Sequence, residues 1–280
     1  MKLQQVEPAQ GAAWVRRGAQ VFVRQPLGFA ALFAACLFIF VLMRSMPLVG
    51  SLLLLMVAPV GSLVFMIASR LVTEGSSPMP GAFTGIARAG RPRLIGLAKL
   101  GLAYLVAALA VYLISAAVDG GAFGDLVDSM RDGKASQEET LARMGNGRMQ
   151  FAVIFWLTMV SLLAVPFWHA PALVFWGAQS WARALFFSTI AIWRNRGAFA
   201  MFGLVWSALS LGFVVVSGIG VALLGPQFYA FVGTPLMLAL ATVFYASLWF
   251  TYAGCFAEAD TAEPDPVSAR PSDNNQENRP

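Results

Sequence analysis

The first candidate for a chemical role in this sequence is its one histidine, His169, which lies between Pro166 and Pro171 in an apolar stretch. Two prolines five residues apart remove two amide donors from a helix and leave carbonyls of the preceding turn without partners. An ionisable side chain at membrane depth is a candidate for a ligand or gating role, and a broken helix can line a cavity. The alternative is a neutral histidine that hydrogen-bonds the backbone released by the prolines.

Two pairs of arginines form the second candidate site. Arg91 and Arg93 flank a proline, whereas Arg194 and Arg196 flank an asparagine. Proline and asparagine favour turns, and a turn can hold paired guanidinium groups around a phosphate. One interpretation is therefore a pocket for anionic lipid headgroups. The other is that these arginines anchor the cytoplasmic ends of membrane spans.

The sequence contains no constellation for catalysis, for a metal or for a cofactor. Cys36 and Cys255 are far apart in apolar segments, which is typical of inert small hydrophobic residues. Phosphate-binding loops, dinucleotide motifs, GxSxG elbows and HExxH motifs are all absent from the sequence. We therefore expect a protein that is not an enzyme, without catalytic residues, metal ligands or cofactor-binding residues.

The composition identifies the elements that must position these residues. Of the 280 residues, 58% are hydrophobic and 12% are charged, whereas soluble domains carry roughly 25% charged residues. This excludes a soluble domain, a disordered protein and a disulfide scaffold. The basic residues occur singly or in pairs beside apolar runs, which favours membrane headgroups over nucleic acid as partners. We predict an all-α, polytopic helical membrane protein.

Six apolar stretches are close to or above the roughly 20 residues that cross a bilayer. They cover residues 27–43, 48–72, 94–118, 151–177, 198–224 and 230–257. Twelve of the 19 lysines and arginines fall on one side of these stretches and five on the other, and the last two belong to the C-terminal tail. Since basic loops stay in the cytoplasm, both termini are predicted to be cytoplasmic.

Three segments lie outside the spans. Residues 1–26 are predicted to form a cytoplasmic amphipathic segment, and the polar tail 258–280 is predicted to be disordered. The outer loop 119–150 interrupts the membrane domain 27–257. A helical apolar stripe that begins at Phe123 predicts a short helix lying on the membrane or against the spans. A capping pattern at Ser136 predicts a second short helix.

Three segments resemble one another, at residues 11–29, 81–97 and 177–199. Each is compatible with a helix, ends in a basic turn and enters a span. We therefore predict three units, each an interfacial helix followed by a transmembrane hairpin; residue identity among the segments is low, so this repeat is a hypothesis. In the first segment Trp14 and Gly18 share one face and Arg16 and Arg17 the other, as in a helix lying in the headgroup plane.

The third segment is more apolar than the other two. Its ten residues 184–193 lie between Arg183 and Arg194 and are too few to cross a bilayer. A re-entrant or buried helix is an alternative to an interfacial one. A seventh span through residues 172–193 would place Arg183 in the middle of the membrane, at a cost of at least about 2.5 kcal/mol, and is rejected.

The opening run Trp14-Val15-Arg16-Arg17-Gly18 resembles the start of a family of uncharacterised six-span inner-membrane proteins of proteobacteria. The residues that extend the resemblance are Phe22, Pro26, Pro171-Ala172-Leu173-Val174, Ala184-Leu185, Ser188 and Arg194-Asn195. The likeness covers most of residues 10–257, and its motifs are short. It implies a six-span fold in the inner membrane and transfers no catalytic residue.

The expected function is that of a non-enzymatic, multi-pass protein of the bacterial inner membrane. Its expected partners are membrane lipids, including anionic headgroups, or another membrane protein; the oligomeric state stays open. The alternative is a transporter or lipid translocator with a cavity near His169.

Overall fold

The computed structural model describes residues 2–47, 49–131, 142 and 145–257. The chain is helical, with one antiparallel pair of two-residue strands, β1 (Lys2–Leu3) and β2 (Phe256–Ala257). The helices are α1 (Gln10–Arg24), α2 (Pro26–Arg44), α3 (Val49–Thr73), α4 (Gly81–Ala87), α5 (Arg91–Asp119), α6 (Ala122–Arg131), α8 (Gly147–Phe167), α9 (Ala170–Phe175), α10 (Trp181–Arg194), α11 (Arg196–Leu224), the π-helix η1 (Tyr229–Gly233) and α12 (Thr234–Cys255). The prediction of an all-α fold is confirmed.

The predicted number of spans is also confirmed for the described residues. Six helical stretches are long and apolar enough to cross a membrane: Pro26–Arg44, Val49–Thr73, Arg91–Asp119, Gly147–Phe175, Arg196–Leu224 and Tyr229–Cys255. Prolines in the first turns of α2 and α5 explain two of the starts, because proline presets the helical φ where no amide partner is needed. Gly120 ends α5 with a φ of 69°, a left-handed cap that glycine adopts without strain.

These long helices form three hairpins, and a short helix precedes each of them along the chain. The order is α1 before α2–α3, α4 before α5–α8, and α10 before α11–α12. This matches the element order predicted for three units. Two additions distinguish the second unit: α6 lies in its outer loop, and α9 continues α8 beyond a break.

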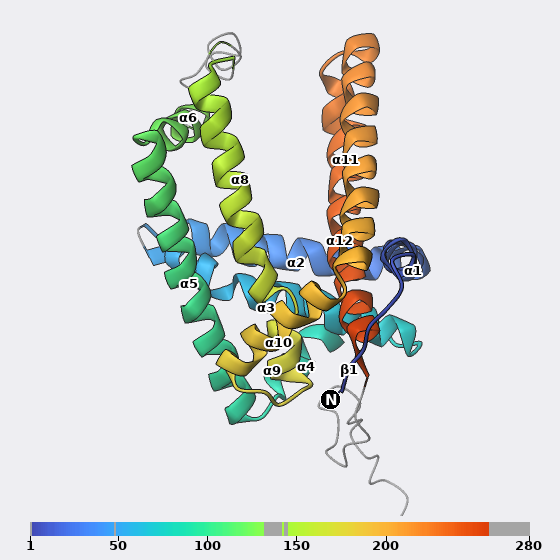
Figure 1. Ribbon diagram of the computed structural model, residues 1–280. Coiled ribbons are helices and arrows are strands. Elements are labelled where there is room, and N and C mark those ends of the chain that lie inside the picture. Colours follow the sequence, from blue (N-terminus) through green and yellow to red (C-terminus); the bar gives the residue numbers. More distant parts are fainter. Residues whose placement is uncertain (1, 48, 132–141, 143–144, 258–280) are drawn as a thin grey trace, which may run out of the picture.

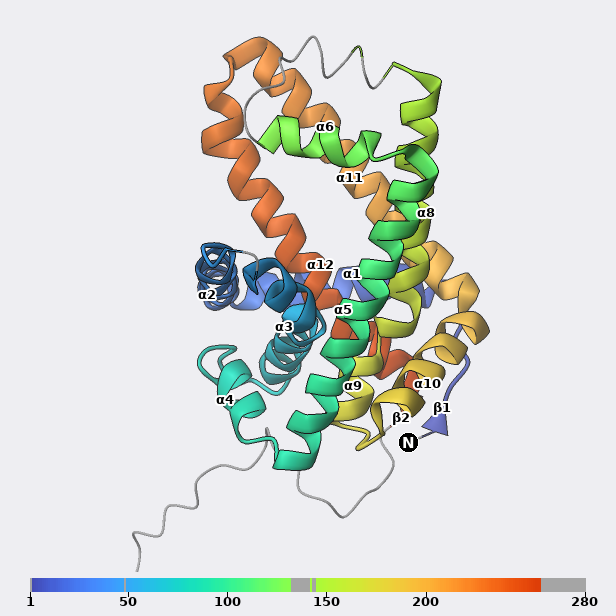
Figure 2. The ribbon, with the colours of Figure 1, turned by 90° about the vertical axis from the view of Figure 1, so that its left-hand side faces the viewer.

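The three hairpins do not run in one direction. In Figure 1, α5, α8, α11 and α12 run up the view, whereas α2 runs across it. In Figure 2, after a turn of 90°, α2 is seen nearly end-on. The α2–α3 hairpin therefore lies crosswise to the other two. Helices α11 and α12 diverge from their shared tip, and α1 passes across their open end (Figure 2).

One core holds the three units together in a ring. The short helix of each unit packs against the second helix of the preceding hairpin: α4 on α3, α10 on α8, and α1 on α12. The C-terminal parts of α3 and α12 meet α9 in the centre, where most side chains of residues 63–72, 170–175 and 246–252 are buried. The antiparallel pairing of β1 with β2 brings both described ends of the chain to the same face.

Helix α1 is an integral part of this core. Its apolar face includes Trp14, which is 1% exposed, while Arg16 and Arg17 point outward. A side chain at Gly18 would place its Cβ 2.7 Å from the Cβ of Ser247 on α12, and one at Gly11 would collide with the backbone of α11. The two faces are divided as the sequence predicts. However, the apolar face contacts α11 and α12 rather than a headgroup layer.

The distal parts of the hairpins are exposed. Residues 37–42 of α2 are all more than a third exposed, and so are most residues from 203 to 216 on α11. On the second hairpin, α6 packs against α5 and α8, with Leu126 buried and the Phe123 and Trp156 ring centroids 5.2 Å apart. This confirms a first loop helix against the spans. The second loop helix, predicted to begin at Ser136, and the tail 258–280 lie outside the described residues.

Candidate functional site

The fourth span is broken where its two prolines predict, between the end of α8 at Phe167 and the start of α9 at Ala170. In a continuous helix the amide of His169 would bond the carbonyl of Val165. Here the hydroxyl of Ser188, on α10, lies between them. It accepts from the His169 amide at 3.0 Å and donates to the Val165 carbonyl at 3.0 Å. One hydroxyl thus satisfies both backbone groups at the break.

The imidazole of His169 contacts a different helix. Its Nε2 lies 3.1 Å from Oγ1 of Thr251 on α12. The Thr251 hydroxyl donates to the carbonyl of Leu248 at 2.8 Å, and it also accepts from Nε1 of Trp168 at 3.2 Å. Since its one proton is already given to Leu248, Thr251 accepts from His169, and we assign the imidazole proton to Nε2.

In the assigned tautomer Nδ1 of His169 carries no proton and can only accept a hydrogen bond. This atom has no hydrogen-bond partner among the described residues. The side chain is 0% exposed. Aromatic rings pack around the imidazole, with centroid distances of 5.7 Å to Phe199, 5.5 Å to Phe256 and 6.1 Å to Tyr252. The backbone released by the prolines was the partner of the ring in one of the two interpretations of the sequence. In the structure the ring contacts Thr251 instead, and Ser188 bonds the released backbone.

The described part of this span borders a pocket, but it is not the cavity predicted beside His169. That pocket has a volume of about 420 Å³ and lies along one face of α8. Its lining residues are Ile154, Leu157, Thr158, Ser161, Leu162 and Val165. His169 is not among them. The α8 groove is therefore open, mainly apolar and separate from the histidine.

The four candidate arginines occupy two separate helix junctions. Arg91 and Arg93 begin α5, whereas Arg194 ends α10 and Arg196 begins α11. The α4–α5 junction and the α10–α11 junction lie apart in both views (Figures 1 and 2). Arg91, Arg194 and Arg196 are exposed, and Arg93 is half-buried. The structure therefore offers two basic junctions rather than one pocket lined by all four side chains.

Asn195, between two of these arginines, is a structural residue that sequence reasoning missed. It is 2% exposed. Its Oδ1 accepts from the amide of Val6 at 2.8 Å, and its Nδ2 donates to the carbonyls of Gln4 and Ala191, each at 3.0 Å. Its Nδ2 also lies 3.5 Å from Sγ of Cys255. Asn195 thereby fastens the N-terminal segment to the α10–α11 junction.

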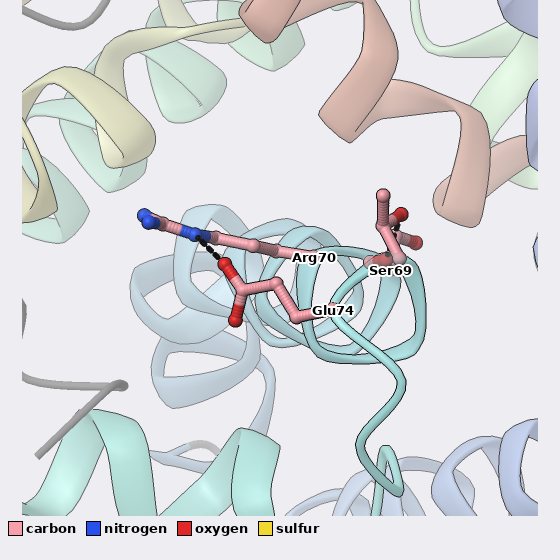
Figure 3. A network of polar contacts seen from close by, with 4 residues as sticks. Ser69, Arg70 and Glu74 are labelled. Atoms are coloured by element: carbon pink, nitrogen blue, oxygen red, sulfur yellow. Dashed lines mark hydrogen bonds and ion pairs between the residues drawn. The ribbon is translucent and has the colours of Figure 1, made fainter.

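Arg70 is a second group that the sequence did not single out. Near the end of α3, its Nε donates to Oε1 of Glu74 at 2.9 Å (Figure 3). Its guanidinium lies over Trp176 and Trp249, 5.7 Å and 5.5 Å from their ring centroids. The neighbouring Ser69 donates to the carbonyl of Ala246 on α12 at 3.0 Å. These contacts join α3 to the other two units by cation–π and hydrogen-bond interactions.

The described residues contain no group of three or more His, Cys, Asp or Glu side chains that could hold a metal ion. Several polar side chains at the centre of the fold, among them Ser188, Thr251 and Asn195, instead form hydrogen bonds between different segments. Their arrangement can fix helix positions and close a helix break. The groups that remain available for contacts are the exposed arginines and the apolar faces of the hairpins.

A comparison with curated proteins finds a relative in Burkholderia thailandensis that is described as a probable inner membrane protein. It is 31% identical to this chain over 266 residues, which cover 94% of this chain and 97% of the relative. No family profile matches the chain, and no solved structure matches it. The similarity extends through all six apolar helices and both termini of the membrane domain, and the chain therefore belongs to the same family of inner-membrane proteins.

Proposed function

We propose that this protein is a non-enzymatic, multi-pass inner-membrane protein that works by contacting lipid. The observation that carries the proposal is the separation of a packed core from exposed apolar arms. Residues 37–42 of α2 are exposed on every side of the helix, with Phe38 at 69%. Exposure all around a helix suits hydrocarbon as its surroundings, since a soluble helix hides one face.

The central polar groups support a structural rather than a catalytic role. Ser188, Thr251 and Asn195 each make several hydrogen bonds to backbone or to side chains of other segments. A catalytic group must instead lie within reach of a substrate. His169 is fully enclosed by protein, which favours packing over chemistry.

The exposed arginines favour anionic headgroups as the lipid chemistry that is recognised. Arg91 lies at the α4–α5 junction, and Arg194 and Arg196 lie at the α10–α11 junction. The excess of basic residues at this end of the hairpins supports a cytoplasmic location for it and for both termini, by the positive-inside rule. Guanidinium groups at this depth reach lipid phosphates.

A transporter or lipid translocator is the second candidate, and one observation favours it. Nδ1 of His169 is buried and has no partner among the described residues, and a buried unpaired acceptor costs about 1–3 kcal/mol. A solute that donates a hydrogen bond to Nδ1 would remove that cost. Such a role requires an opening between the aromatic rings around the imidazole.

Native mass spectrometry of protein extracted in mild detergent tests the proposal. We expect the wild type to retain a discrete anionic phospholipid and the Arg91/Arg93/Arg194/Arg196→Gln variant to lose it. Neutralising each junction separately identifies which pair holds the lipid. Arg148→Gln, at the opposite end of the second hairpin, is the matched control and should retain it. A bare wild-type chain, or one that carries a stoichiometric protein partner in place of lipid, would reject the lipid-contact proposal.

A further inference from the structure

Helix α10 has an inner face that fixes it to the core. The inward side chains Ala184, Ser188 and Ala191 are each 0% exposed. Ser188 closes the break between α8 and α9, as described above, and the C-terminal end of the helix is held by Asn195. The helix is therefore firmly positioned, and its other side is presented outward as a fixed surface.

The outward face of α10 is rich in aromatic side chains. Trp193 is 70% exposed and Phe186 61%, and Trp181 and Phe187 are each more than a third exposed. Arg183 and Arg194, near the two ends of the helix, are exposed as well. Aromatic rings between two basic residues are typical of helices at a membrane interface, where the rings sit at headgroup level.

The position of α10 in the chain agrees with that depth. It connects the end of one candidate span, at Phe175, with the start of the next, at Arg196. These two ends must lie on the same side of the membrane. With 14 residues, α10 is about 21 Å long, which is shorter than the roughly 30 Å hydrocarbon core. In both views it runs obliquely across the direction of α8 (Figures 1 and 2).

We propose that α10 lies in the cytoplasmic interface of the membrane and that its outward face binds anionic phospholipids. Phe186 and Trp193 enter the boundary between headgroups and acyl chains, while Arg183 and Arg194 bond lipid phosphates. This assigns a lipid-binding surface to the third of the short helices, for which the sequence left a re-entrant or buried position open. The inference rests on the proposed lipid contact and specifies where it occurs.

The charge at both ends favours lipid over a protein partner on this face. Residues 183 and 194 are 11 positions apart, which corresponds to about 16 Å along the axis, so they reach different headgroups. In the part of the chain that the structure describes, neither arginine makes an ion pair with an acidic side chain. Two cations separated by an apolar, aromatic surface complement a layer of phosphates above acyl chains.

Site-directed spin labelling in vesicles tests this placement. Single cysteines replace Phe186 and Trp193 in a chain whose native Cys36 and Cys255 are alanine, and Leu211, 65% exposed on α11, provides a reference within a span. In phosphatidylcholine vesicles containing phosphatidylglycerol, we expect labels at 186 and 193 to show the same depth near the phosphates, and the label at 211 to lie deeper. Arg183→Gln with Arg194→Gln should abolish the effect of phosphatidylglycerol on label mobility at 193.

Three results would overturn the inference. One is full accessibility of both labels to an aqueous nickel chelate. Another is a depth difference of about 10 Å between positions 186 and 193, the axial length of seven helical residues, because it would mean steep insertion. The third is dipolar broadening that disappears on dilution with unlabelled protein, because it would mean that a second copy covers the face. If the labels are accessible to water but the protein still retains lipid in native mass spectrometry, only the α10 site is rejected. If the labels lie at headgroup depth but the protein carries no lipid in native mass spectrometry, only the proposed lipid retention is rejected.

Discussion

Ser188 bonds the backbone of His169 across a helix break, although the two residues lie 19 positions apart on different helices. The serine hydroxyl replaces the carbonyl that a continuous helix would offer to the His169 amide. The broken span is thus stabilised by α10, whose Ser188 hydroxyl bonds the backbone on both sides of the break. Such replacement is what permits irregular backbone at membrane depth.

Ser188→Ala should therefore destabilise the protein. It leaves the His169 amide without a partner and leaves the Val165 carbonyl only the long 3.5 Å contact from the Trp168 amide, at a cost of about 1–3 kcal/mol for a buried unsatisfied group. Thermal unfolding in detergent measures the loss. Thr189→Ala is the matched control, because Thr189 is exposed and bonds only the backbone of its own helix. Equal stability of the two variants would show that the hydroxyl does not hold the break.

His169→Ala should lower stability by about 2–4 kcal/mol, since it leaves a cavity among packed aromatic rings. His169→Gln should retain more of that stability, because a Gln amide can still donate to Thr251. Lipid retention per folded molecule should not change in either variant. Unchanged stability combined with lost retention would contradict a packing role and favour the transporter alternative.

Gly18→Ala should destabilise the contact between α1 and α12. The added methyl group would lie 2.7 Å from the Cβ of Ser247, so the two helices must separate, and overpacking of this kind costs about 1–3 kcal/mol. Gly203→Ala provides the control, because nothing lies within 4 Å of the Cβ it would add. That substitution should be neutral or stabilising, since alanine favours helix. A Gly18→Ala variant as stable as Gly203→Ala would refute the close packing of α1.

Asn195→Ala should release the N-terminal segment. The amide of Val6 and the carbonyl of Gln4 both lose their partner, so we expect hydrogen exchange at Val6 to accelerate by about tenfold or more. Hydrogen-exchange mass spectrometry of the segment preceding α1 measures this. Arg194→Gln, at the adjacent exposed position, should leave the exchange unchanged. Persistent protection in Asn195→Ala would show that the pairing of β1 with β2 alone holds the segment.

The sequence predicted the features of the fold that depend on local pattern. The lengths of the apolar stretches predict the six spans, and the positions of Pro166 and Pro171 predict the break in the fourth span. Contacts between distant residues have no such signal in the sequence. Asn195 bonds the amide of Val6 across 189 positions, and neither residue type indicates that the two segments pair. At the α10–α11 junction, Arg194 and Arg196 are the candidates in the sequence because they are charged. The neutral Asn195 between them is the residue that is buried.

The crosswise α2–α3 hairpin was not predictable for a similar reason. Its helices are 19 and 25 residues long and, like the other four spans, are long and apolar enough to cross a membrane. The composition along one helix carries no information about its angle to another. That angle depends on contacts at the base of the hairpin, where Phe29 and Leu32 are buried while the distal part of α2 is exposed. Apolar patterning therefore predicts a membrane hairpin but not its tilt.

The most direct test of the whole account is the accessibility of single cysteines to a membrane-impermeant maleimide in intact cells. The proposed six-span topology puts Ser45 and Gln227, in the turns of the first and third hairpins, outside the cytoplasm, and Gln20 of α1 inside. It predicts that Ser45→Cys and Gln227→Cys are labelled in intact cells and that Gln20→Cys is labelled only after permeabilisation. Protection of Ser45→Cys from outside, with Gln227→Cys labelled, would contradict the six-span arrangement and show that the α2–α3 hairpin does not cross the membrane.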